Sequence, residues 1–84
     1  MRLPIIKQTN GLIKDQGVEQ LQNTINVLEQ VGEFRGIKDH ELDVIGELLS
    51  NFYGALEVHK SIEQGVPERE ALNEFMKRVM GSIA

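Results

Sequence analysis

The side chains with the clearest chemical potential are those of His59 and Glu63, which lie four residues apart. On a helix this spacing places an imidazole and a carboxylate on one face, where both could bind the same metal ion. Zinc needs at least three protein ligands, so one chain offers half a site and a second copy would have to supply the rest. The alternative is a packed imidazole hydrogen-bonded to a carboxylate or carbonyl, which is the commoner role of a histidine that ends an apolar stripe.

Other catalytic patterns are missing from the sequence. The chain has no cysteine, which excludes disulfides, thiolate catalysis and cysteine-based metal sites. Neither histidine follows a glutamate by three residues, as the di-iron helical bundles require. There is also no phosphate-binding glycine loop and no nucleophile-elbow serine. We therefore expect no enzyme activity and no cofactor.

The element that must position His59 and Glu63 is one long helix over residues 39–64. Apolar residues recur at steps of three and four along it, at Leu42, Ile45, Leu49, Phe52 and Leu56. Asp39 is the predicted N-cap, and Gly65 is the predicted stop. Such a helix is about 38 Å long, whereas a compact chain of this size has a radius of gyration of about 12 Å. Two shorter helices end to end, or a second copy, must cover it, and we expect a homodimer.

Small residues recur every four positions within this helix, at Gly46, Ser50 and Gly54. Each glycine costs about 1 kcal/mol relative to alanine in a helix interior, so two of them need a physical reason. Close approach of another helix is one reason, and a kink at Gly54 is the other. We expect close packing, and assign Gly46, Ser50 and Gly54 to the interface of the dimer.

The rest of the chain is expected to form three shorter helices over residues 4–14, 18–32 and 67–82. The first is ambiguous, because Asn10-Gly11 between two apolar pairs is also a hairpin signal. A hairpin needs further strands to join, and no other strand candidate exists, so we expect a helix. Residues 33–38 form a loop, with Phe34 and Ile37 expected to fold back onto the core. The sequence thus predicts one all-α domain over residues 1–84, a small four-helix, bundle-like fold built around the long helix.

The outward face of the second expected helix carries amides where most surface helices carry charge. These residues are Gln16, Gln20, Gln22, Asn23, Asn26 and Gln30. Because amides lose their water more cheaply than charged groups, this face could meet a partner. An ordinary solvated face is the alternative.

The charge distribution bears on the class of partner. The formal net charge is −4, without a long run of either sign, and nowhere do 18 apolar residues follow one another. We therefore expect no nucleic-acid partner, no membrane partner and a cytoplasmic location. Five cations lie near the two ends of the chain, and we expect them to be ion-paired at the surface: Arg2, Lys7, Lys14, Lys77 and Arg78.

Three segments carry a resemblance to a known family. They are ELDVIGEL at residues 41–48, YGALEVHK at residues 53–60, and EALN with FMKRVMGSI at residues 70–73 and 75–83. The chain resembles an uncharacterised family of short, all-helical bacterial proteins, a domain of unknown function. The likeness implies no activity and no site residues. It implies one association, with thiol-peroxide redox systems, in which a chain without cysteine could be only an accessory protein.

Taken together, the sequence leaves the function unknown and favours a non-enzymatic helical protein that self-associates and binds another protein. One alternative is a metal-binding protein whose His59 and Glu63 are shared across a dimer. The other is the accessory role in a thiol-peroxide redox system.

Overall fold

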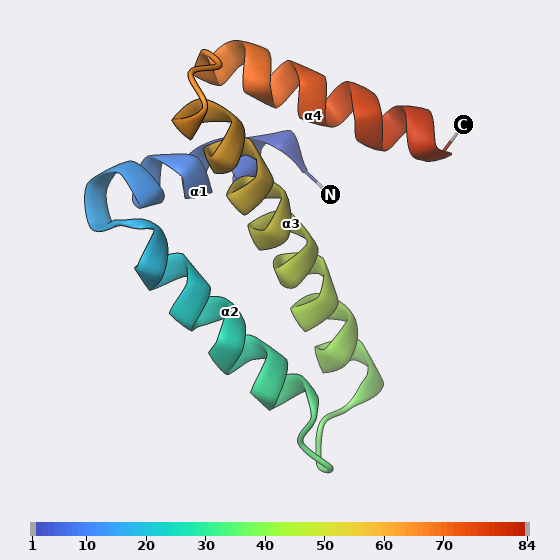
Figure 1. Ribbon diagram of the computed structural model, residues 1–84. Coiled ribbons are helices and arrows are strands. Elements are labelled where there is room, and N and C mark those ends of the chain that lie inside the picture. The colour runs from blue at the N-terminus through green and yellow to red at the C-terminus, as the bar shows by residue number, and fades with distance from the viewer. Residues whose placement is uncertain (1, 84) are drawn as a thin grey trace.

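The computed structural model describes residues 2–83, and of residues 80–83 only the backbone. The described chain has four helices: α1 (Leu3–Gln16), α2 (Val18–Gly32), α3 (Asp39–Glu63) and α4 (Glu68–Ile83) (Figure 1). No strand occurs within residues 2–83, so the predicted all-α fold is confirmed.

The long helix α3 contacts each of the other three helices, whereas α2 and α4 do not contact each other in the described chain. Helix α2 runs antiparallel alongside α3, and α1 and α4 gather at the C-terminal half of α3 (Figure 1). The molecule measures 43 × 34 × 17 Å. Its radius of gyration of 13.7 Å exceeds the value of about 12 Å for a compact chain of this length. The fold is therefore a thin slab with little interior.

The ambiguous N-terminal segment is helical throughout. Asn10 is buried, and its Nδ2 donates a hydrogen bond to the Ile6 carbonyl at 3.1 Å. The Thr9 hydroxyl donates to the Ile5 carbonyl at 2.7 Å. Both polar side chains are thus satisfied by their own helix, which ends at Gly17 with a φ of 90° that favours glycine. The hairpin alternative is wrong, because Leu3–Gln16 form one helix and no strand occurs among residues 2–83 for Asn10-Gly11 to join.

The predicted N-cap of α3 is wrong by one residue. Lys38 occupies that position, and its backbone N–H donates to Glu41 Oε1 at 2.9 Å. Glu41 lies three residues into the helix, so its carboxylate makes the part of a capping box that accepts from the N–H of the N-cap residue. At the other end Gly65 has a φ of 100°, as the predicted stop requires.

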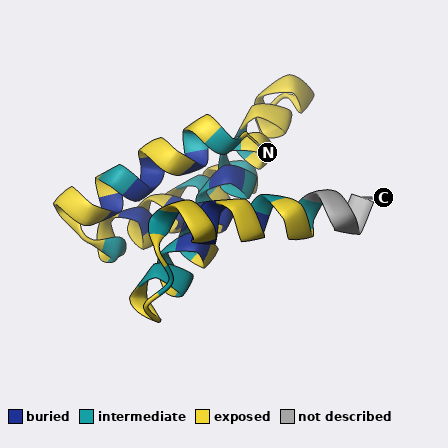
Figure 2. Cartoon of the chain, turned by 90° about the horizontal axis from the view of Figure 1, so that it is seen from above, coloured by how far each residue is buried: buried dark blue, intermediate teal, exposed yellow. Residues whose placement is uncertain are grey.

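The hydrophobic core lies where α1 and α4 pack on the C-terminal half of α3 and the N-terminal half of α2 packs beside α1 and α3 (Figure 2). Its members are Ile6, Ile13, Leu21, Ile25, Ala55, Val58, Ala71, Leu72 and Phe75. On α3 the buried apolar residues are Ala55 and Val58, both in its C-terminal half. The N-terminal half of α3 has α2 beside it and no helix across it, which leaves apolar side chains there in contact with water.

Candidate interaction surface

The predicted metal pair is close together. His59 Nε2 lies 3.4 Å from Glu63 Oε1, and the two side chains are 21% and 69% exposed. Within the described residues no group of three or more histidine and carboxylate side chains could hold a metal ion. The geometry within one chain is that of a partly packed imidazole beside a carboxylate. A metal site shared with a second copy stays a prediction.

The three small residues of α3 do not share one environment. A Cβ built on Gly54 would lie 2.9 Å from Phe75 Cζ and 3.2 Å from Ile6 Cδ1. Close packing at Gly54 is therefore confirmed, but its neighbours are α1 and α4 of the same chain. A Cβ on Gly46 would meet nothing within 4 Å, and Ser50 is half-buried. The role of Gly46, Ser50 and Gly54 in a dimer stays a prediction, in which Gly54 is already covered by its own chain.

Apolar side chains are exposed at the free end of the α2–α3 pair. A hollow there is lined by Lys38, His40 and Glu41 and by an apolar set that we call the tip patch: Val31, Phe34, Ile37, Val44 and Ile45. Phe34 is 68% exposed and Val44 is 58% exposed. The expected return of Phe34 to the core is wrong, because the helices that cover the core, α1 and α4, lie at the opposite end of α3 (Figure 1).

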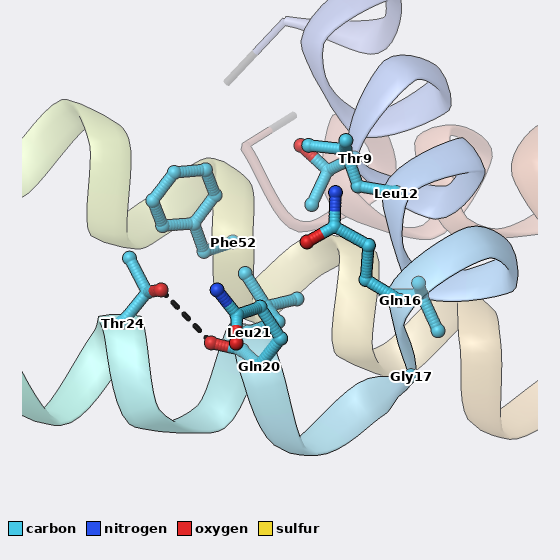
Figure 3. Close-up of a pocket in the computed structure, with 9 residues that line it drawn as sticks. Thr9, Leu12, Gln16, Gly17, Gln20, Leu21, Thr24 and Phe52 are labelled. Carbon is cyan, nitrogen blue, oxygen red and sulfur yellow. Dashed lines mark hydrogen bonds between the residues drawn. The ribbon is translucent and has the colours of Figure 1, made fainter.

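A second hollow lies at the other end of α2, where α1, α2 and α3 meet (Figure 3). We call it the base pocket, and it has a volume of about 180 Å³. Its apolar walls are Leu12, Ile13, Leu21 and Phe52, and Gln16 and Gln20 lie at its rim. No ionisable side chain lines it.

The polar groups of the base pocket differ in how far their hydrogen-bonding capacity is used. Thr9 and Thr24 donate their hydroxyl hydrogens to carbonyls of their own helices, at 2.7 and 2.8 Å. The carboxamides of Gln16 and Gln20 have no hydrogen-bond partner in the described chain. They are the groups that could bind an incoming molecule by hydrogen bonds.

The tip patch and the base pocket open on the same side of the slab. On α2, Thr24 lines the base pocket and Val31 lines the tip hollow, seven residues further on. On α3, Phe52 lines the base pocket and Ile45, seven residues earlier, lines the tip hollow. Seven residues are almost two full turns, so each pair shares one face of its helix. Val27, which is 59% exposed, lies between the two sites on α2.

The cations near the chain ends are partly paired, as expected. Lys14 Nζ lies 2.8 Å from Glu68 Oε2, and Arg78 forms an ion pair with Glu57. These pairs tie α1 to α4 and α3 to α4, so they leave less free positive charge there.

One further polar contact joins α2 to α3. The Tyr53 hydroxyl donates to Glu29 Oε2 at 2.8 Å. This hydrogen bond, with some desolvation and the nearby negative charge, raises the pKa of Tyr53 above its ordinary value of 10.0.

Asn51 is a buried polar residue that sequence reasoning missed. Its side chain is fully buried, its Nδ2 donates to the Glu47 carbonyl at 2.8 Å, and its Oδ1 accepts from the Arg2 N–H at 2.7 Å. Arg2 is the N-cap of α1. Asn51 therefore fixes the start of α1 on the middle of α3, which is a structural role.

The model of a family described as "Family of unknown function (DUF6952)" matches residues 1–84, so the chain belongs to this family. No curated protein and no solved structure matches the chain. None of the helices over residues 2–83 is both long and apolar enough to cross a membrane.

Proposed function

We propose that this member of the DUF6952 family is a non-enzymatic protein-binding module whose first partner is a second copy of itself. The observation that supports the proposal is the tip patch, where Phe34 and Val44 are more than half exposed. Exposed apolar patches on small proteins commonly mark interaction sites. The pairing surface is the face that carries both the tip patch and the base pocket.

The dimensions of the chain support pairing. A stable interface buries about 800 Å² on each partner, which is a small part of the 6112 Å² that this chain exposes. A broad face of 43 × 34 Å is large enough to supply it. A chain that leaves Phe34 and Val44 more than half exposed also gains stability when a partner removes these side chains from water.

Charge favours this face for self-pairing. Two copies of a chain with a net charge of −4 repel each other wherever their carboxylates meet. The strip along α2 from the base pocket to the tip patch is Gln20, Thr24, Val27 and Val31, and it has no ionisable group. Two copies could approach along it without placing like charges together.

The test is the mass in solution, measured by light scattering behind a sizing column over a range of concentrations. We expect twice the chain mass of 9.5 kDa for the native protein, and a monomer for Val44→Asp. Gln22→Asp adds the same charge to an exposed position of α2 outside the patch and should leave the dimer intact. A native protein that is monomeric at every concentration would refute the proposal.

A further variant separates this surface from the stripe predicted from the sequence. Gly46→Leu changes an exposed position where a new side chain has room. If Gly46→Leu abolishes pairing while Val44→Asp does not, the interface lies at Gly46 and Ser50 and the tip patch is not involved.

A metal-binding function is the second candidate, and the 3.4 Å approach of His59 to Glu63 favours it. We propose that two such pairs, one from each copy, would complete a four-ligand site. Elemental analysis of protein purified without a histidine tag tests the idea. A metal content far below one per dimer, unchanged in His59→Ala, would end it.

A further inference from the structure

The most exposed large apolar side chain in the described residues is Phe34, with 68% of its surface in contact with water. It lies at the turn between α2 and α3, with its ring over Gly36. An aromatic ring displayed in this way stays exposed in the single chain at a considerable cost in free energy. A partner site that removes the ring from water would recover that free energy.

The base pocket has the size and chemistry of a socket for one such ring. Its volume of about 180 Å³ is below the range of about 300–1,000 Å³ that is typical of cofactor and ligand sites. Its walls are apolar, and Phe52 offers an aromatic surface to a second ring (Figure 3). A pocket of this kind resembles the sites that hold a single aromatic anchor at the centre of an interface.

The positions of the two features fit a two-fold dimer. They lie at opposite ends of α2, which has 15 residues and a length of about 22 Å. Both open on the side of the slab where α1 crosses. When two copies meet face to face with their α2 helices antiparallel, the tip of each copy comes to the base of the other. A two-fold axis then makes both contacts equivalent.

We propose that Phe34 of one copy inserts into the base pocket of the second, and that Phe34 of the second copy inserts into the base pocket of the first. This inference rests on the proposed self-association and names its anchor and its socket. The carboxamides of Gln16 and Gln20 lie at the rim, where they can hydrogen-bond to the backbone of the incoming loop.

Charges near the two features support this orientation. Arg35 and Lys38 are close to Phe34 in the sequence, and Asp15 and Glu19 adjoin the rim glutamines of the base pocket. None of these four side chains forms an ion pair within the described chain. Glu33, Asp39 and Glu41 are also close to Phe34 in the sequence, and Glu41 lines the tip hollow, so the tip as a whole has no net positive charge. What supports the antiparallel arrangement is a local contact: it lets Arg35, next to Phe34, meet Asp15 or Glu19 at the base of the other copy, which a parallel one would not.

The first experiment uses a single fluorophore. The chain has no tryptophan, so Phe34→Trp carries the only one. We expect its emission to shift to shorter wavelength as concentration rises, with the same midpoint as the dimerisation measured by light scattering. Gln22→Trp, at an exposed position outside both sites, should keep the emission of a hydrated indole throughout.

The outcomes of this experiment separate the two proposals. If light scattering shows a dimer of Phe34→Trp while its emission stays that of a hydrated indole, the insertion is wrong and self-association stands. If both the native protein and Phe34→Trp remain monomers at every concentration, both proposals fail.

The second experiment uses complementation between two variants. Phe34→Ala removes the anchor, and Leu12→Glu puts a charge into the socket at a residue that is 51% exposed, where folding tolerates it. Each variant alone should dimerise about tenfold or more weakly than the native chain. Circular dichroism confirms that both are folded.

A mixture of the two variants should pair more tightly than either variant alone. In the mixed dimer, Phe34 of the Leu12→Glu copy still meets an intact socket on the Phe34→Ala copy, so one insertion survives. A mixed dimer no tighter than the two parent variants would overturn the inference.

Discussion

Val58 and Val44 are the same residue type on the same helix, yet 1% of one and 58% of the other is exposed. They lie 14 residues apart on α3, which is close to four full turns, so they project from nearly the same side. The difference is what lies across them. The C-terminal half of α3 is covered by α1 and α4, whereas no helix crosses the N-terminal half (Figure 1). The C-terminal half of α3 therefore belongs to the hydrophobic core, whereas the N-terminal half is a surface available to a partner.

The two glycines of α3 follow the same division. Gly54 lies in the covered half, with Phe75 and Ile6 where its side chain would be. Gly46 lies in the uncovered half, where a side chain would meet nothing within 4 Å. Within the repeat of small residues, Gly54 is therefore required by the packing of α1 and α4, whereas Gly46 is under no such constraint.

The largest difference in unfolding free energy is expected between two variants that replace these glycines by leucine. Gly54→Leu must displace Phe75 and Ile6, and overpacking of this kind costs about 3 kcal/mol of unfolding free energy. Gly46→Leu should stabilise the chain by about 0.5–1 kcal/mol, since leucine is the better helix former. Urea unfolding followed by circular dichroism measures both. Equal effects at the two positions would show that α4 does not pack on Gly54.

A second contrast comes from truncating the two valines to alanine. Val58→Ala removes two buried methyl groups and should cost about 2–3 kcal/mol. Val44→Ala should cost less than about 0.5 kcal/mol at concentrations where the protein is monomeric. The same urea titrations, repeated at high protein concentration, should reveal an added cost for Val44→Ala alone if the tip patch is covered in a dimer. If Val58→Ala lowered the unfolding free energy as little as Val44→Ala does, Val58 would not belong to the core.

The sequence could not predict which half of α3 is covered by other helices. The apolar spacing from Leu42 to Leu56 continues through both halves, so it predicts the helix correctly but not which part is covered. Which half of α3 is covered depends on the directions that the turns at Gly17 and Gly65 give to α1 and α4. Gly65 was predicted as a stop, but a stop does not specify the direction of the next helix.

The candidate site was less predictable than the fold. Phe34 was expected to fold back onto the core, but the helices that could cover it, α1 and α4, lie at the other end of α3. The base pocket combines residues of three helices, whose crossing geometry is not encoded in any one of them. Its signal in the sequence was the run of amides from Gln16 to Gln30, which indicated an uncharged face without locating a hollow.

A smaller effect is expected at Asn51, which fixes α1 onto the middle of α3. Asn51→Ala leaves the N–H of Arg2 without its acceptor and removes the donor to the Glu47 carbonyl. The expected cost is about 1–2 kcal/mol. Asn23→Ala, at an exposed position on α2, should change unfolding by less than about 0.5 kcal/mol. Hydrogen exchange should also speed up in the first turn of α1 for Asn51→Ala, and unchanged exchange there would contradict the anchoring role.

The smallest effect concerns the contact between Tyr53 and Glu29, which joins α2 to α3. The hydrogen bond to Glu29 raises the pKa of Tyr53 above 10.0, so the native state holds the phenol proton more tightly than the unfolded state does. The contribution of this contact is therefore complete below pH 10 and is lost as the pH rises through the native pKa. Tyr53 is the only tyrosine, so ultraviolet absorbance follows its ionisation alone. We expect a midpoint above 10.0 that falls towards 10.0 in Glu29→Ala. A native midpoint at or below 10.0 would show that the two helices are not joined at this point, and that α2 is held on α3 by apolar contacts alone.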